Sequence, residues 1–368
     1  MTTKKTDEPA GHTLNPATSD QATSNKVQLI YAGGTFGSYG KPLSALPAAT
    51  FLPLLMDKVK QNLTSNIEVL ENSCVKDSSQ LSPADFSHFY QLILSRYTQG
   101  YRHFVLITGT DTLSYLGSFL AEAFAGSDLS LVLTASMRPL FDANDIHNYS
   151  IDPNSDAWDN LSEAIGLAAH GEAGVFVTFA GESWPAQTVQ KIHSHDLMAF
   201  TGHARAGYPA NSYVQSLPAA RRKNWIEDSQ AKLARITTQA KNAVIPTIYC
   251  VPNSGEWLSS QLTALLELPP TGIIFMGFGA GNIPFSEQLA QSLDKLYKHG
   301  HIVVCTTQCP YGGVSEAYAA GSWQYQHHVL SAGRLTVPAV YARLLWLHLA
   351  FDTPARRRQR WSYSVNKL

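Results

Sequence analysis

The sequence predicts an α/β protein with a larger N-terminal domain, built on a mostly parallel sheet, and a smaller C-terminal α/β domain. Short apolar runs of strand length alternate with longer amphipathic segments from Val27 onward, which is the pattern of βαβ units. A chain of 368 residues is also too long for one ordinary hydrophobic core. A polar stretch at 212–242 separates two such alternating series, so we expect two domains.

The N-terminal domain is expected to span 26–211. Its best-marked helix is 82–101, because Ser82 suits the N-cap, Pro83 the first helical position and Asp85 the first turn. Further helices are expected at 47–63 and 112–126, and strands at 26–32, 66–73, 102–110, 129–136 and 172–181.

Residues 212–242 are predicted to be a connector, because they are polar and contain no apolar run of strand length. The C-terminal domain is expected to span 243–368. Its strands are expected at 243–252, 271–282 and 300–310, with helices at 259–269 and 285–300 between them. A group of arginines is predicted to lie on the solvated face of the last helix: Arg356, Arg357, Arg358 and Arg360.

Composition narrows the class of partner. The formal net charge is -1 and 44% of the residues are hydrophobic, which predicts a soluble globular protein with no electrostatic reason to bind nucleic acid or an anionic membrane. The four cysteines match no CxxC pattern, which favours a reducing compartment. Residues 1–25 are polar and lack the apolar core of a secretory signal, so we expect a disordered leader and a cytoplasmic protein.

The loops after the expected strands are the places to look for a ligand, because open α/β sheets bind ligands at the carboxyl ends of their strands. The first strand runs into Gly33, Gly34 and Thr35, and the strand at 102–110 runs into the sequence TGTDT. Three interpretations of the first loop are open: a phosphate cradle, an exposed nucleophile and a plain tight turn. The phosphate interpretation is weak, because the loop has neither the GxxxxGKS/T nor the GxGxxG spacing.

A threonine nucleophile needs a base and an orienting group. Thr110 and Asp111 stand side by side at a strand end, and Lys191 follows a later strand. Lys191 could serve as the base if burial lowered its pKa, and Asp111 could hold a substrate ammonium group. His193 and His195 lie near Lys191, but no third ligand has suitable spacing, so we expect no metal and no cofactor.

Six motifs together resemble the bacterial-type L-asparaginase family, and most of all its cytoplasmic type I branch. They are "AGGTF", "DSSQLSPADF", "TGTDT", "SDAWDNLSEAI", "AQTVQKIHSHDLMAF" and "VVCTTQC", and they occur in the order of the family. The resemblance implies an asparaginase-like fold, with catalysis in the N-terminal domain.

The resemblance implies that the protein hydrolyses the side-chain amide of L-asparagine to L-aspartate and ammonia, with weak glutaminase activity as an open possibility. Thr35 would be the nucleophile that forms an acyl-enzyme. Thr110, Lys191 and Asp111 match the family's second catalytic group, and Asp111 would also grip the substrate's α-ammonium. Substrate binding would further use Ser78, for the α-carboxylate, with Ser79 beside it and Asn282. Because the family's counterpart of Asn282 reaches the neighbouring subunit's site, a homodimer or homotetramer is implied.

The chain departs from the family pattern at several positions. Tyr39 is the candidate for the catalytic tyrosine on the loop after the nucleophile, although this loop is shorter here. Ala157 replaces the glycine of the S-D-G motif, Met276 replaces the arginine of allosterically controlled type I relatives, and Glu316 is the candidate for the acidic residue of the second domain. Two other functions stay open: an amino-acid-binding sensor without turnover, and an amidotransferase-type subunit that produces ammonia.

Overall fold

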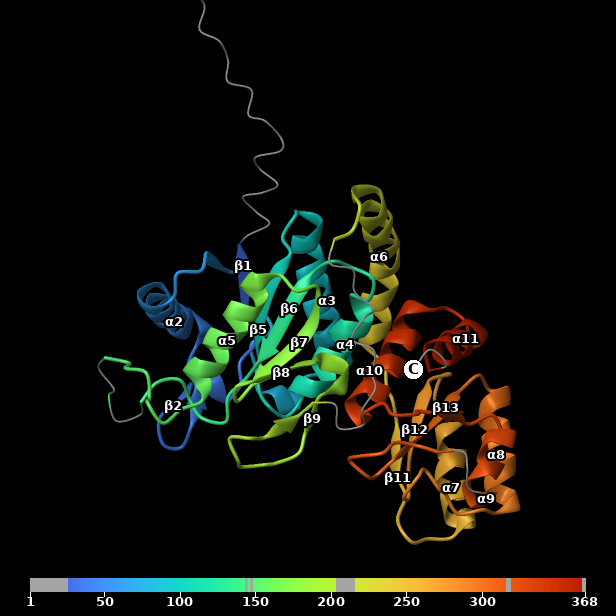
Figure 1. The fold of residues 1–368 in the computed structure, drawn as a ribbon. Helices are drawn as coiled ribbons and strands as arrows, with labels where there is room; N and C mark the ends of the chain where they lie inside the picture. The colour runs from blue at the N-terminus through green and yellow to red at the C-terminus, as the bar shows by residue number, and fades with distance from the viewer. Residues whose placement is uncertain (1–25, 143–144, 146–147, 203–215, 316–318, 366–368) are drawn as a thin grey trace, which may run out of the picture.

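The computed structural model describes residues 26–142, 145, 148–202, 216–315 and 319–365 (Figure 1). The predicted leader, 1–25, and Glu316 lie outside the described residues. Within the part of the chain that the structure describes, no helix is both long and apolar enough to cross a membrane.

The N-terminal domain is built on a six-stranded sheet. Its first five strands are parallel and the last is antiparallel to its neighbour, in the order β4 (Ile67–Val69), β1 (Val27–Tyr31), β5 (His103–Ile107), β6 (Ser130–Thr134), β7 (Gly174–Phe179) and β8 (Glu182–Pro185). The predicted fold class is therefore confirmed. All five residues of β1 are buried, as expected for a strand covered on both faces.

The position of β1 decides where a ligand can bind. The chain leaves β1 for β4 on one side and then returns to β5 on the other, with Val27 pairing with both Ile67 and His103. In doubly wound sheets such a reversal of strand order opens a crevice at the carboxyl ends of the two strands. The turns after β1 and β5 therefore meet at one edge of the sheet.

Helices cover both faces of this sheet. In Figure 1, α2 (Ala48–Asn62) and α5 (Ala157–His170) lie on one side, and α3 (Pro83–Thr98) and α4 (Leu113–Ala123) lie on the other. The helix predicted at 82–101 begins at Pro83, and Ser82 and Asp85 form a reciprocal capping box at its start.

The C-terminal domain has a parallel sheet of four strands: β11 (Thr247–Tyr249), β12 (Gly272–Gly277), β13 (Ile302–Thr307) and β14 (Leu330–Ser331). Three helices pack with it: α7 (Gly255–Leu265), α8 (Glu287–Lys298) and α9 (Ala319–Gln326). The polar stretch between the two sheets contains the long helix α6 (Ala219–Ala240). Its described residues form no strand, as expected from the lack of an apolar run of strand length.

The two domains share hydrophobic core through α10 (Val337–Ala350), which lies between α4 and β12 (Figure 1). A buried ion pair crosses the same contact, with Arg343 Nη2 2.8 Å from Glu122 Oε1. Burial of apolar surface on both sides of α10 makes the domains one packed unit.

The prediction of a solvated arginine face on the last helix, α11 (Pro354–Val365), is wrong for two of its four members. Arg357 is 7% exposed and donates from Nε to the Phe351 carbonyl at 2.8 Å. The Arg358 guanidinium lies 4.2 Å from the centre of the Tyr297 ring. Carbonyl groups and an aromatic ring of neighbouring elements supply partners that the local sequence does not reveal.

Candidate active site

Two glycines end β1 and allow three turns to pack together. Gly33 and Gly34 have φ angles of 99° and 88°, in the left-handed region that favours glycine. A Cβ on Gly34 would lie 2.5 Å from the Cα of Gly109, and a Cβ on Gly33 would lie 2.4 Å from the carbonyl oxygen of Lys76. Any larger residue would push these backbones apart. Thr35 follows directly and begins a short 3-10 helix, Thr35–Gly37, with its side chain half-buried.

The turn after β5 supplies the second threonine. Thr110 is 9% exposed and stands one residue after Gly109, the glycine that touches Gly34. The close approach of the two glycine backbones therefore brings the turns that carry Thr35 and Thr110 into contact.

Lys191 reaches this turn from a separate hairpin. It ends β9 (Gln190–Lys191), which pairs antiparallel with β10 (Phe200–Thr201). Its Nζ donates a hydrogen bond to Thr110 Oγ1 at 2.8 Å and pairs with Asp111 Oδ1 at 2.8 Å. The Lys191 side chain is 23% exposed, whereas that of Asp111 is 60% exposed and accessible to a ligand. The structure thus brings together three of the predicted site residues over a separation of 80 residues.

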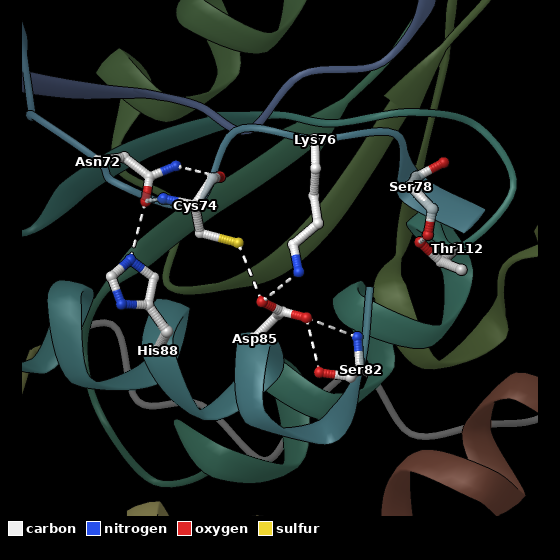
Figure 2. Close-up of polar contacts among 8 residues, drawn as sticks. All are labelled: Asn72, Cys74, Lys76, Ser78, Ser82, Asp85, His88 and Thr112. Carbon is white, nitrogen blue, oxygen red and sulfur yellow. Dashed lines mark hydrogen bonds and ion pairs between the residues drawn. The ribbon is translucent and has the colours of Figure 1, made fainter. Parts of the chain in front are cut away.

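Ser78 belongs to the same cluster. It begins a 3-10 helix, Ser78–Gln80, and is 3% exposed. A Cβ on Gly109 would lie 2.4 Å from Ser78 Oγ, so the serine packs on the TGTDT turn. Thr112 Oγ1 donates to the Ser78 carbonyl at 2.9 Å (Figure 2). Ser79 is exposed, and its hydroxyl donates to Asp77 Oδ1 at 2.6 Å, which rigidifies the turn.

Tyr39 lies on a hairpin after Thr35, in β2 (Ser38–Tyr39), which pairs with β3 (Ser44–Ala45). Its ring packs 5.5 Å from that of Tyr149. Its hydroxyl is buried, with no hydrogen-bond partner among the described residues, and burial raises the pKa of Tyr39. No hydrogen bond between the described residues joins Tyr39 to Thr35, so its catalytic assignment stays a prediction.

Asn282 stands apart from this cluster, in the C-terminal domain. It forms an antiparallel bridge with Phe278, and its side-chain Oδ1 is buried against Gly321, with no hydrogen-bond partner among the described residues. Within one chain, the described contacts do not bring Asn282 to the turns that carry Thr35 and Thr110. Met276, the position at which the resemblance implies an arginine in allosterically controlled relatives, lies in β12 and is half-buried.

Two residues that hold the neighbouring loops have a role that the sequence interpretation missed. The carboxylate of Asp156 accepts hydrogen bonds from the backbone N–H groups of Met137 and Arg138, at 2.9 and 3.0 Å. Asn160 is 1% exposed, and its Oδ1 accepts from the Ala180 backbone N–H at 2.8 Å. Together they fasten the loops after β6 and β7. The sequence does carry a signal for this role: Asp156 and Asn160 are spaced i, i+4 at the start of a helix, which places both side chains on one face.

His193 and His195 lie on the exposed hairpin that carries Lys191. The His195 backbone N–H donates to His193 Nδ1 at 3.1 Å, so the first histidine supports the local turn. Among the residues that the structure describes, no group of three or more histidine, cysteine, aspartate or glutamate side chains could hold a metal ion.

The family models match both domains of the chain. Residues 26–216 match "Asparaginase, N-terminal" and residues 247–360 match "Glutaminase/Asparaginase C-terminal domain". The chain belongs to the asparaginase family. It is therefore an asparaginase-family enzyme of the amidohydrolase class.

Named relatives span most of the chain. An L-asparaginase of Thermococcus kodakarensis is 28% identical over 326 residues, covering 87% of this chain and 92% of the relative. L-asparaginase 1 of Escherichia coli strain K12 is 25% identical over 331 residues, with 87% and 91% covered. One subunit of the glutamyl-tRNA(Gln) amidotransferase of Aeropyrum pernix is 26% identical over 351 residues, with 89% and 75% covered.

The solved structure of the thermostable L-asparaginase from Thermococcus kodakarensis has the same fold. It superposes with a TM-score of 0.68 at 25% sequence identity and covers 91% of this chain and 96% of its own.

Proposed function

We propose that this asparaginase-family enzyme hydrolyses the side-chain amide of L-asparagine to L-aspartate and ammonia. One observation carries the proposal: the contact between Gly34 and Gly109 at the switch point of the sheet. It places the turn of Thr35 against the turn of Thr110, whose hydroxyl already accepts a hydrogen bond from Lys191. A hydroxyl nucleophile beside a hydrogen-bonded hydroxyl–amine pair is an arrangement suited to acyl transfer.

In the proposed mechanism, the Thr35 hydroxyl oxygen attacks the amide carbon, while the Lys191 ammonium gives a proton to the leaving nitrogen and takes up the Thr35 proton through Thr110. The carbon–nitrogen bond breaks and ammonia leaves, and an ester joins the acyl group to Thr35. Water then attacks this ester, restoring the hydroxyl and releasing the carboxylic acid. Backbone N–H groups at the glycine-rich turns are suited to stabilise the oxyanion, because they are held rigidly at strand ends.

Substrate recognition is proposed to use the two charged ends of the amino acid. Asp111, whose exposed carboxylate faces solvent beside Lys191, would hold the α-ammonium. Ser78 would bind the α-carboxylate, and Ser79 lies next to it on the same turn. Fixing both ends turns attack by a weak nucleophile into a nearly unimolecular step. We propose further that Asn282 completes the site of a neighbouring subunit in a homodimer or homotetramer, in the cytoplasm.

The resemblance to the amidotransferase favours one alternative, an ammonia-producing subunit that works with a partner. Such a protein would release ammonia efficiently only in the presence of that partner. An amino-acid-binding sensor, the third possibility, would bind L-asparagine and release no ammonia.

The test measures ammonia release from L-asparagine and L-glutamine by the purified full chain, its Thr35→Ala and Thr35→Ser variants, and a Thr238→Ala control. Thr238 is an exposed residue of α6 whose hydroxyl donates to the Ala234 carbonyl of its own helix, away from the described site residues, so we use it as the control. We expect turnover of L-asparagine that is abolished in Thr35→Ala and partly kept in Thr35→Ser. Binding of L-asparagine without ammonia release by the wild-type chain would replace the proposal with the sensor function.

A further inference from the structure

A polar cluster joins the first turns of α3 to the segment between β4 and α3 (Figure 2). Its centre is the carboxylate of Asp85, in the first turn of α3. Asp85 Oδ2 accepts hydrogen bonds from the Ser82 backbone N–H at 2.7 Å and from the Ser82 hydroxyl at 2.6 Å. Its other oxygen, Oδ1, pairs with Lys76 Nζ at 2.8 Å and accepts from the Cys74 thiol at 3.2 Å. One carboxylate therefore holds both the helix start and the segment that precedes it.

The second oxygen of Asp85 is not needed for helix capping. In a capping box, the side chain at the third helical position accepts a hydrogen bond from the backbone N–H of the N-cap residue. Oδ2 of Asp85 makes this bond without help from Oδ1. Oδ1 is directed at the loop instead. Burial alone would raise the pKa of Asp85, but the Lys76 ammonium and the Ser82 donors outweigh it and lower the pKa to about 2. The contact is therefore charged on both sides at neutral pH.

The segment that Asp85 holds is the one that packs on the turn before Thr35. The Lys76 backbone N–H donates to the Ala32 carbonyl at 3.1 Å, and the Lys76 carbonyl occupies the space where a Cβ of Gly33 would lie. Two residues later, Ser78 is buried against Gly109. A shift of residues 74–78 would therefore move the Ser78 turn relative to the two threonine turns.

A second contact from the same helix holds the start of this segment. His88 lies three residues after Asp85, on the same face of α3, and its Nε2 donates to Asn72 Oδ1 at 2.8 Å. Asn72 in turn donates from Nδ2 to the carbonyls of Tyr31, the last residue of β1, and Cys74, at 3.0 and 2.7 Å. Helix α3 thus fixes the segment at two points, and both lead back to the end of β1.

We propose that Asp85 is a positioning residue for substrate binding, which holds residues 74–78 through Lys76 and Cys74 so that Ser78 meets the amino-acid substrate. This inference rests on the proposed function, because it assumes that an amino acid binds at Ser78. Asp85 does not contact the reacting atoms. Its loss should therefore weaken binding of the substrate's α-carboxylate end more than it slows the chemical step.

The test compares Asp85→Asn and Lys76→Met with a Ser82→Ala control. All three change groups around one helix start, but Ser82→Ala leaves the Lys76 ion pair in place. We expect KM for L-asparagine to rise about tenfold in Asp85→Asn and Lys76→Met, with kcat within about twofold of wild type. The KM of Ser82→Ala should stay within about twofold. The double variant Asp85→Asn/Lys76→Met should match the single variants, because both remove the same contact.

Unchanged KM in Asp85→Asn, or an equal rise in Ser82→Ala, would overturn the positioning role, and so would additive effects in the double variant. Backbone hydrogen exchange over 74–80 gives a readout independent of turnover: Asp85→Asn should speed exchange there, and Ser82→Ala should not. If the wild-type chain releases no ammonia, the proposed function fails separately. L-asparagine binding by calorimetry then replaces KM, with the same expected tenfold loss and the same refuting outcomes.

Discussion

The contact between Gly34 and Gly109 allows a direct test of how the site is assembled. In Gly34→Ala the new Cβ would lie 2.5 Å from the Gly109 Cα and 2.6 Å from its backbone nitrogen. Ordinary carbon contacts begin near 3.5 Å, so the two turns must separate by about 1 Å. Both neighbours are backbone atoms, and neither can swing aside as a flexible side chain would.

Gly126→Ala is the control, because it places a Cβ at a glycine of positive φ without the clash. Gly126 has a φ of 80°, close to the 88° of Gly34, but its Cβ would lie 3.8 Å from the Trp225 ring. The positive φ should cost Gly126→Ala about 1 kcal/mol of unfolding free energy. It should cost Gly34→Ala about 1–3 kcal/mol, because a φ of 88° with a ψ of -175° lies in a region that is populated almost only by glycine. The clash should add about 1–3 kcal/mol in Gly34→Ala alone.

The same separation of the two turns should also slow the reaction. A displacement of about 1 Å between a nucleophile and its partners can reduce the rate about a hundredfold. We therefore expect kcat/KM for L-asparagine to fall about a hundredfold in Gly34→Ala and to stay within about threefold in Gly126→Ala. Steady-state ammonia release and urea unfolding measure the two quantities. A Gly34→Ala variant with wild-type kcat/KM would refute the idea that this backbone contact assembles the site.

Three other contacts, one of them within the candidate site, can be tested in the same way. Lys191→Met removes the ammonium that bonds both Thr110 and Asp111, so kcat for ammonia release should fall by about 10²–10⁴. A fall of less than twofold would exclude a role of Lys191 in proton transfer. Asp156→Ala removes the acceptor for the backbone N–H groups of Met137 and Arg138, and should lower the free energy of unfolding, measured in urea, by about 2 kcal/mol. An unchanged urea midpoint would contradict this. Burial, followed by two nearby guanidinium groups, lowers the pKa of His348 to about 4 from 6.5. The stability that its neutral form supports is therefore complete above about pH 6.5 and is lost as the pH falls toward 4, since the unfolded chain binds the proton first. Wild type should lose about 1 kcal/mol more than His348→Gln between pH 7 and pH 5, and equal losses would disprove this assignment.

The sequence alone was sufficient for the α/β class and for the order of the elements, because these depend on local patterns. The buried run of β1 and the capping box of α3 are both encoded within a few residues. Local patterns gave the wrong prediction for Arg357 and Arg358. Their partners, the Phe351 carbonyl and the Tyr297 ring, belong to other elements. Helical periodicity states which residues share a face, but not what covers that face.

The order of the residues is enough to predict that Thr35 follows two glycines at a strand end and that Thr110 and Asp111 follow another strand. The folded chain is needed to see that these two strands are neighbours, that Gly34 and Gly109 touch, and that Lys191 Nζ lies 2.8 Å from Thr110 Oγ1. The physical reason is that strand order and backbone contact arise from burial of both sheet faces over the whole domain, which no short stretch of sequence contains. The role of Asp85 belongs to the second group, because its cap is visible in the sequence and its ion pair with Lys76 is not.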